Sequence, residues 1–172
     1  MTTLNSLHDV FVEQLGDLYS AERQLVQTLP AVASSATAPE LRDAIQHHRE
    51  ETQRHVTRLE QVFTELGEPY PLAKTCEGMQ GILAEGEHVI QATGIGSAKD
   101  AGIIANAQRA EHYEIAGYGT AKAMAKELDL SSTIEDLLAA TLGEESNADQ
   151  ALTKIATGGL FRSGVNESAL TT

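Results

Sequence analysis

Apolar residues recur at alternating spacings of four and three along most of this chain, which restricts it to packed helices. In the N-terminal segment this spacing joins Phe11, Leu15, Leu18, Leu25 and Leu29. A repeat of this kind places one apolar stripe along a helix and is typical of helices packed side by side in a bundle. No strand-like alternation of apolar and polar residues persists anywhere in the sequence. We therefore predict an all-α fold.

The residues that interrupt these stripes predict four long helices and one weaker helix. The first long helix ends before the loop around Thr37, with a kink or break expected at Pro30. The second begins at Pro39, a favoured first-turn residue, and ends at Gly67, a favoured C-terminal cap. At about 1.5 Å per residue it is about 40 Å long, which is typical of a helical bundle.

A connecting helix and two further long helices follow. The weaker helix covers about residues 75–93 and is expected to form a long crossover that sets the direction of the next helix. The third long helix covers about residues 97–128, with Ser97 and Asp100 as a capping pair. The fourth starts at Ser132 and ends at a pair of glycines.

Size, charge and cysteine content limit the number of domains, the binding partners and the cellular location that we expect for this bundle. A chain of 172 residues fits one domain, which we place at residues 1–157, followed by a flexible tail over residues 158–172. The formal charge of -13 opposes binding to nucleic acid or to an anionic membrane. A single cysteine, Cys76, no visible signal peptide after Met1 and no apolar run near the roughly 18 residues that span a bilayer favour a soluble cytoplasmic protein.

Carboxylates and histidines interrupt the apolar stripes near the middle of every long helix. On the first helix Glu22 takes a stripe position between Leu18 and Leu25. The others are His48, Glu51 and His55 on the second helix, Glu111 and Glu114 on the third, and Glu145 with Glu144 and Asp149 on the fourth. Residues three, four or seven apart share one helix face, so we expect these side chains to face the bundle interior.

Such residues are costly in a core unless something neutralises them. Glu and Asp are almost never fully buried unless they are paired or bound to a metal, and several carboxylates at one level repel one another. Cations remove both penalties, and oxygen ligands combined with imidazole suit iron or manganese. Because carboxylates can bridge two metals, we predict a site for two iron or manganese ions.

Each residue taken alone also has a simpler interpretation. A single Glu near a stripe can extend to water at the bundle edge, and a single core His is more often hydrogen-bonded than metal-bound. Tyr19 and Tyr118 each lie one turn from a candidate carboxylate, and a hydrogen bond to it would be a packing role. Glu144, beside Glu145, joins these tyrosines as a supporting residue. The recurrence on four helices favours the metal site.

Four short stretches, taken together, resemble the YciE/YciF family. They are LYSAERQL at residues 18–25, HREETQRH at 48–55, AEHYEIA at 110–116 and TLGEE at 141–145, and the likeness covers about residues 4–156. The resemblance implies a ferritin-like four-helix bundle with an additional crossover helix, a homodimer, and expression in a bacterial stress response. It also implies a ferroxidase-like or other di-metal oxidoreductase.

The ferritin-like ligand pattern is matched only in part. That pattern has one Glu on the first and third long helices and a Glu-x-x-His pair on the second and fourth. Glu22 matches the first position, and either glutamate of the third helix matches the third. The second helix instead has Glu51 with His48 three residues earlier or His55 four residues later, and the fourth has Asp149 and no histidine.

Two functions are compatible with these residues. In the first, oxygen or peroxide reacts at the metal pair. Glu51 and Glu145, or the two glutamates of the third helix, bridge the ions, Glu22 and Asp149 bind terminally, and a histidine of the second helix donates nitrogen. In the second, the protein is a non-enzymatic dimeric bundle with an interaction or structural role in stress, and its buried carboxylates are hydrogen-bonded or protonated.

Overall fold

The computed structural model describes residues 4–94, 96–159 and 162–170. In chain order the elements are α1 (Leu7–Ser35), α2 (Pro39–Leu66), α3 (Glu77–Gln91), α4 (Gly96–Glu127), α5 (Ser132–Thr157), β1 (Gly158–Gly159), β2 (Arg162–Ser163) and α6 (Val165–Leu170). Helices account for most of this part of the chain, and the two strands have two residues each, which confirms the predicted all-α class.

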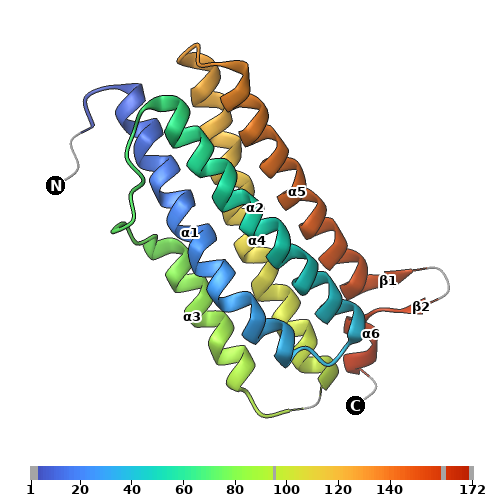
Figure 1. Ribbon diagram of the computed structural model, residues 1–172. Coiled ribbons are helices and arrows are strands. Elements are labelled where there is room, and N and C mark those ends of the chain that lie inside the picture. The colour runs from blue at the N-terminus through green and yellow to red at the C-terminus, as the bar shows by residue number, and fades with distance from the viewer. Residues whose placement is uncertain (1–3, 95, 160–161, 171–172) are drawn as a thin grey trace.

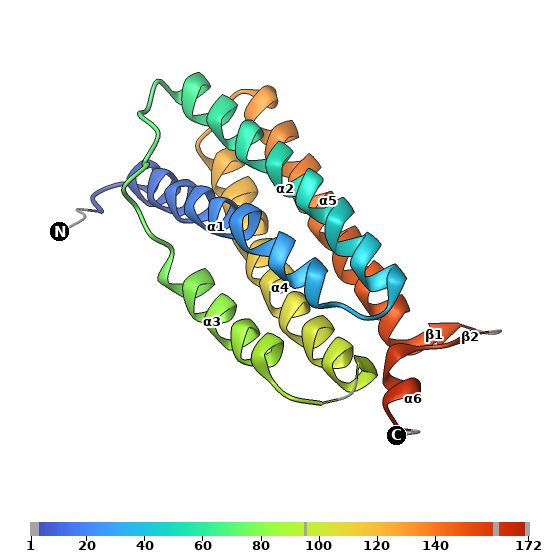
Figure 2. The same ribbon diagram turned by 60° about the horizontal axis from the view of Figure 1, so that its bottom comes forward.

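The long helices α1, α2, α4 and α5 form a ferritin-like four-helix bundle (Figure 1). α1 packs against α2 and α4, and α5 packs against α2 and α4, so each helix has two neighbours in a ring. α2 and α4 run in the same direction, opposite to α1 and α5 (Figures 1 and 2). Two parallel helices require the chain to return along the bundle between them, and the segment containing α3 makes this return. The predicted crossover helix is therefore present.

Local signals explain where the first two helices begin and end. Ser6 caps α1 in a reciprocal pair: its Oγ accepts a hydrogen bond from the backbone of Asp9 (3.1 Å), and Asp9 Oδ2 accepts one from the backbone of Ser6 (3.0 Å). At the end of α2, Gly67 has a φ of 69°, a left-handed conformation that favours glycine. α1 continues through Pro30 to Ser35, so the helix is not broken there, and a kink at Pro30 stays a prediction.

Asp100 connects two elements instead of capping α4 together with Ser97. Its buried carboxylate accepts hydrogen bonds from the backbone N–H groups of Thr37 (2.8 Å) and Ala38 (2.7 Å). These groups lie just before α2, where backbone donors lack helical partners. The loop between α1 and α2 is thereby fixed to the start of α4, and the predicted capping role of Asp100 is wrong.

The segment after Thr157 has more secondary structure than a tail was expected to have. β1 and β2 pair antiparallel, with Gly158 opposite Ser163, and α6 packs against α4 and α5. Arg162 also forms an ion pair with Glu40 near the start of α2. The flexibility of residues 158–172 stays a prediction, and residues 1–3, 160, 161, 171 and 172 lie outside the described part of the chain.

The apolar core is divided into two clusters along the bundle. One cluster contains, among others, Phe11, Leu15, Leu59, Phe63 and Leu138, and the other contains Leu25, Leu41, Ile45, Ile104 and Leu152. On each of the four bundle helices, the order of residues places the candidate ligands between these two sets. The polar side chains therefore form a layer across the middle of the bundle.

Close packing of α3 on α4 depends on two of the three glycines in α3, Gly78 and Gly86, and a Cβ atom at Gly86 would meet the side-chain oxygen of Asn106 on α4. A Cβ atom at Gly78 would lie 2.8 Å from Cε2 of Tyr113, whereas one at Gly81 would meet no atom within 4 Å. The Tyr113 ring is held in place because its hydroxyl donates to Asp17 (2.7 Å) and lies 2.9 Å from the Cys76 sulfur. A side chain at position 78 would collide with this fixed ring, so the packing requires glycine there.

A pair of matched substitutions on α3 tests this packing. We expect Gly81→Ala to raise the free energy of unfolding by about 0.5–1 kcal/mol, because alanine favours the helix and has room. Gly78→Ala should lower it by about 1–2 kcal/mol, because the added methyl group displaces Tyr113. Urea unfolding of both variants measures the difference, and equal stabilisation by both would contradict the packing role of Gly78.

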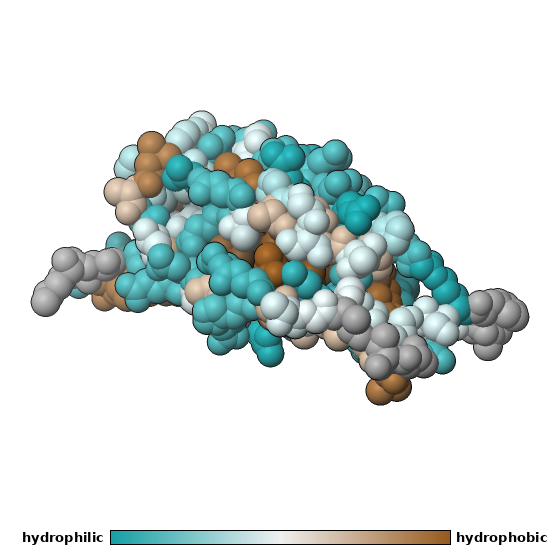
Figure 3. Space-filling view, turned by 90° about the horizontal axis from the view of Figure 1, so that it is seen from below, coloured by the Kyte–Doolittle hydropathy of each residue, from teal (hydrophilic) through white to brown (hydrophobic). Residues whose placement is uncertain are grey.

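The molecular surface fits the acidic composition. The face seen from below is mostly hydrophilic, with a few hydrophobic side chains showing near its middle (Figure 3). Among the helices of the described residues, none has both the length and the apolar composition needed to cross a membrane.

Candidate metal centre

Six side chains from four helices converge in the polar layer. They are Glu22 of α1, His48 and His55 of α2, Glu111 and Glu114 of α4, and Glu145 of α5. His48 is the most exposed of the six, with 7% of its surface accessible. All six were predicted to face the interior, and the structure brings them together there.

The first group lies around His55. Its Nδ1 atom is 2.8 Å from Glu145 Oε1 and 3.3 Å from Glu22 Oε1. Glu22 Oε1 also accepts a hydrogen bond of 2.5 Å from the hydroxyl of Tyr118, whereas the spacing in the sequence pointed to Glu114 as the partner of this tyrosine. One nitrogen and two carboxylate oxygens therefore face one another, and these ligand atoms all lie within 4.8 Å of one another.

The second group lies around His48. Its Nε2 atom is 3.3 Å from Glu111 Oε1 and 3.9 Å from Glu145 Oε2. Glu114 completes the group, whose four ligand atoms also lie within 4.8 Å of one another. One imidazole and three carboxylates thus meet at a second point of the same layer.

Glu145 belongs to both groups. Its Oε1 atom faces His55 and its Oε2 atom faces His48, so one carboxylate spans the two points. Each group contains one imidazole, and both imidazoles come from α2. His48 and His55 lie two turns apart on that helix, which explains how a bundle without a histidine on α5 still has one nitrogen ligand for each group.

Most of the oxygen atoms in the two groups lack hydrogen bonds within the described residues. The atoms without a partner include Glu22 Oε2, Glu111 Oε2, and both carboxylate oxygens of Glu114 and of Glu145. Nδ1 of His55 also lacks a hydrogen-bond partner. It lies 2.8 Å from Glu145 Oε1, but the angle between the two groups is not that of a hydrogen bond. Atoms that converge on shared points without bonding one another are arranged as metal ligands are.

The charges of the layer are unbalanced without a cation. Four buried carboxylates face two imidazoles, so two negative charges stay uncompensated even if both imidazoles are protonated. Leaving such charges buried and unpaired is strongly unfavourable. Bound protons or metal ions must make up the difference.

The pKa values show how the metal-free layer distributes its protons. Burial raises the pKa of Glu22, and it raises the pKa of Glu111 and of Glu114 well above the ordinary value. Burial alone would lower the pKa of the two histidines, but the nearby carboxylates outweigh it and bring the pKa of His48 to about 9 and that of His55 to about 11. The metal-free layer therefore holds protons on several of these groups at neutral pH.

For Glu145 two effects oppose each other. Burial would raise the pKa of Glu145, but the imidazoles of His55 and His48 lower it below the ordinary value. The carboxylate that spans the two groups is therefore ionised at neutral pH, in the state that a metal needs.

A second carboxylate orients His55 from outside. The Nε2 atom of His55 lies 2.8 Å from Glu144 Oε2, and Arg58 holds Glu144 through two hydrogen bonds of 2.6 and 2.9 Å. Because of Arg58, the pKa of Glu144 falls to about 2. Carboxylates in this position fix the ring orientation of metal-binding histidines. Glu144 thus lies where the sequence suggested a supporting residue.

Three predicted residues lie elsewhere. Glu51 faces the outer nitrogen of His48 (3.8 Å) and the exposed His47 (3.4 Å), so it belongs to neither group. Asp149 is turned toward α4, where it accepts a hydrogen bond from Gln108 (2.9 Å). Tyr19 donates to Glu60 (2.9 Å) instead of a ligand. Glu51 as a bridging ligand and Asp149 as a terminal ligand do not fit this geometry.

Arg58 was missed in the sequence. It lies on α2 three residues after His55, so it is one turn from a candidate ligand, and that spacing was the available signal. Its partner Glu144 is 86 residues away along the chain. The network of Cys76, Tyr113 and Asp17 under α3 was also not predicted.

A ferritin-like bundle crossed by a buried layer of carboxylates and imidazoles defines the class of this protein: a helical-bundle protein whose buried side chains could hold a metal ion. The chain matches the family described as "Domain of unknown function (DUF892)" over residues 6–169. It is 34% identical over 165 residues to Protein YciF of Escherichia coli (strain K12), covering 96% of this chain and 99% of that protein. The chain therefore belongs to the YciE/YciF family.

Solved structures agree with this assignment. The crystal structure of the E. coli stress protein YciF matches with a TM-score of 0.84 at 36% identity, covering 88% of this chain and 94% of that one. A protein named YcfI from Rhodopseudomonas palustris matches with a TM-score of 0.83, also at 36% identity, covering 88% of this chain and 96% of that one.

Proposed function

We propose that this protein is a di-metal oxidoreductase of the stress response, in which the polar layer binds two iron or manganese ions. The observation that carries this proposal is Glu145, a buried carboxylate whose two oxygens face two different imidazoles and bond to neither within the described residues. Bound iron or manganese would supply electron transfer to oxygen or peroxide.

The side chains of the layer have distinct roles in this proposal. Glu145 would hold a metal ion in either group, because its two oxygens face different imidazoles. His55 and Glu22 would hold an ion in one group, and His48, Glu111 and Glu114 would hold an ion in the other. Arg58 and Glu144 hold His55 in orientation, and Tyr118 does the same for Glu22 through its hydrogen bond. The apolar clusters on both sides of the layer limit access of water.

Metal analysis tests the proposal directly. The full chain is purified without chelators, loaded with Fe(II) or Mn(II), and its metal content is measured by mass spectrometry. We expect two ions per chain, a marked loss in Glu145→Ala, and no change in Glu50→Ala, an exposed residue on α2. Anomalous scattering at the iron and manganese edges then identifies each ion and its ligands. Failure of both metals to bind would overturn the proposal.

Oxidation is tested separately from binding. Loaded protein should oxidise Fe(II) with oxygen or peroxide faster than the Glu145→Ala variant does. If two ions bind but no oxidation occurs, the non-enzymatic alternative holds, in which the bundle has an interaction or structural role.

Metal binding should release protons. The pKa of Glu111 and of Glu114 is raised by burial and that of His48 is about 9, so these groups carry protons at pH 7 that a metal must displace. We expect about one proton or more per ion, and an affinity that falls as the pH is lowered. Calorimetric titration of Mn(II) in two buffers with different ionisation enthalpies measures this number. Binding without proton release would contradict the protonation state described above.

The cellular setting is also part of the proposal. We propose a cytoplasmic protein that binds neither nucleic acid nor membranes, on the basis of its single cysteine and its charge of -13, and a homodimer, on the basis of its family resemblance. Sedimentation equilibrium of the full chain checks the dimer, and a monomer at micromolar concentration would contradict it.

A further inference from the structure

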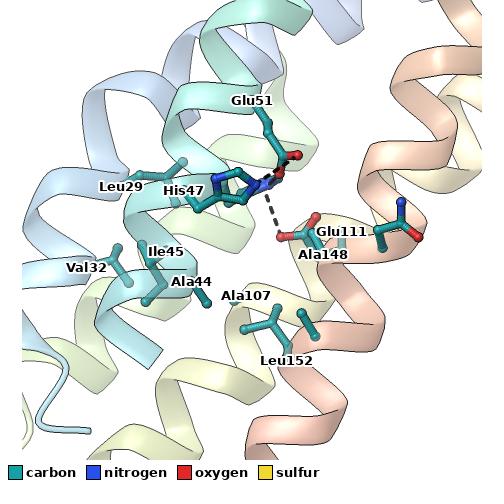
Figure 4. A pocket seen from close by; sticks show the side chains of 13 residues that line it. Leu29, Val32, Ala44, Ile45, His47, Glu51, Ala107, Glu111, Ala148 and Leu152 are labelled. Atoms are coloured by element: carbon teal, nitrogen blue, oxygen red, sulfur yellow. Dashed lines mark ion pairs between the residues drawn. The ribbon is translucent and has the colours of Figure 1, made fainter. Parts of the chain in front are cut away.

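A pocket of about 350 Å³ leads from the surface toward the second ligand group, the one around His48. Residues of α1, α2, α4 and α5 line it, so it enters the bundle itself and is not a groove between two helices. Its wall has two kinds of side chain: His47, Glu51 and Glu111 lie on one side, apart from apolar side chains such as Leu152 (Figure 4). The pocket therefore joins solvent to the edge of the candidate metal centre along one polar wall.

The polar wall is a series of side chains that can act as metal ligands. His47 Nε2 lies 3.4 Å from Glu51 Oε1, and Glu51 Oε2 lies 3.8 Å from His48 Nδ1. His48 Nε2 in turn lies 3.3 Å from Glu111 Oε1 and 3.9 Å from Glu145 Oε2. The exposed fraction of the side chain falls in the same order: 68% for His47, 16% for Glu51, 9% for His48, 4% for Glu111 and 0% for Glu145. Each ligand thus lies deeper than the one before it and close to a shallower one.

Glu51 differs from the carboxylate that orients the other imidazole. Glu144 lies 2.8 Å from the outer nitrogen of His55, and Arg58 holds it with two hydrogen bonds. Glu51 lies 3.8 Å from the outer nitrogen of His48, and that nitrogen is buried without a hydrogen-bond partner within the described residues. Glu51 therefore does not fix its imidazole as Glu144 does, and its carboxylate stays available to a cation.

The pocket is wide enough for a hydrated ion. About six water molecules around a divalent cation occupy about 180 Å³, at about 30 Å³ each, which is less than the volume of the pocket. Ala44, Ala107 and Ala148 line the pocket with small side chains and leave this space. Because the apolar wall has no ligand atoms, an ion in the pocket can be bound only along the polar wall.

The charge at the entrance depends on Glu51. Burial alone would lower the pKa of His48, but Glu111 and the other nearby carboxylates raise it to about 9, so the ring is cationic at neutral pH when no metal is bound. Arg54 adds a second positive charge 3.7 Å from Glu51. Glu51 lies within 4 Å of both groups and offsets them. Without its carboxylate, an approaching cation would be repelled.

We propose that this pocket is the path by which Fe(II) or Mn(II) enters the centre, and that Glu51 and His47 bind the ion in transit. These two residues take up the ion near the surface, and Glu111 and Glu145 then receive it in the layer. The proposal rests on the proposed function, because it needs the metal positions to which the ion is delivered. It also assigns a role to Glu51, which belongs to neither ligand group.

Loading kinetics test the role of Glu51. Metal-free full-length protein is mixed with Mn(II), and the loss of the EPR signal of free Mn(II) is followed over time. We expect Glu51→Gln to bind as many ions as the parent protein but to load them about tenfold more slowly, because it loses electrostatic attraction. Glu50→Gln removes the same charge at the neighbouring exposed position and should load at the parental rate. Fewer ions in Glu51→Gln would make Glu51 a permanent ligand and would overturn the proposal.

Filling the pocket tests the path itself. Ala148→Leu narrows the pocket and should slow loading about tenfold or more, without changing the number of ions bound at equilibrium. Ala140→Leu, at an exposed position of the same helix, should leave the rate unchanged. If Ala148→Leu does not fold, Ala44→Leu fills the pocket from α2. Slower loading in Glu51→Gln but not in a folded filling variant would show that the ion reaches Glu51 by another route, which also overturns the path.

The two proposals fail in different ways in these experiments. If the parent protein binds two ions at a rate that neither Glu51→Gln nor the filling variant changes, the path is wrong and the metal centre stands. If the parent protein binds neither Fe(II) nor Mn(II), the metal centre is wrong and the path is refuted with it.

Discussion

Glu114→Met should stabilise the metal-free protein while weakening its metal binding. Glu114 is fully buried, and neither of its carboxylate oxygens has a hydrogen-bond partner in the described part of the chain. Methionine has nearly the same length and no unpaired oxygen atoms to desolvate, so the free energy of unfolding in the presence of a chelator should rise by about 1–3 kcal/mol. Metal at the His48 group loses one ligand at the same time. Urea unfolding with and without Mn(II) measures both effects.

A matched control separates this effect from a general effect of methionine. Glu65→Met changes an exposed glutamate on α2 and should alter stability by less than about 0.5 kcal/mol. A metal-free Glu114→Met variant that is less stable than the parent protein would contradict the view that this carboxylate is kept for binding at the expense of stability.

His55→Ala should have the opposite effect on the metal-free protein. The imidazole lies within 3.3 Å of Glu22, Glu144 and Glu145, and its removal leaves these carboxylates without their shared cation. Losing one partner of such a buried set costs about 3–5 kcal/mol. We expect this loss in urea unfolding at pH 6 with a chelator, and His47→Ala, an exposed neighbour on the same helix, should change little.

The effect of His55→Ala should depend on pH in a defined direction. Burial alone would lower the pKa of His55, but Glu145 and Glu22 raise it to about 11 in the folded protein, against about 6.5 in an unfolded chain. The stability that the protonated ring contributes is therefore fully present below about pH 6.5 and is lost as the pH rises toward 11. The difference between the parent protein and His55→Ala should shrink over that range. A constant difference would contradict the charged state of the ring.

The bundle could be predicted from the sequence because its stripes are local. Spacings of three and four residues set which side chains share a helix face, and this placed Glu22, His48, His55 and Glu145 inside the bundle before any contact was known. α6 could not be predicted in the same way. It has six residues, and its contacts with α4 and α5 come from parts of the chain that are distant in sequence.

The same spacing was misleading where a neighbouring helix decides the direction of a side chain. Asp149 follows Glu145 by four residues, a spacing that allows a shared face, but Gln108 of α4 takes its carboxylate out of the layer. The spacing of Glu51 between two histidines predicts a ligand, whereas its carboxylate faces the outer side of His48 and the exposed His47. Helix periodicity predicts which face of a helix a residue occupies. It does not predict the side-chain rotamer, which depends on partners from other helices.

The division of the core into two apolar clusters has a consequence for how the four helices are held together. Among the described residues, the apolar cluster that contains Phe11 and Leu138 is separate from the cluster that contains Leu41 and Leu152, and the ligand layer lies between them. A metal ion held in that layer would join side chains of all four bundle helices at the level where the two apolar clusters meet. It would therefore add a cross-link between the helices at the place where apolar packing does not connect them.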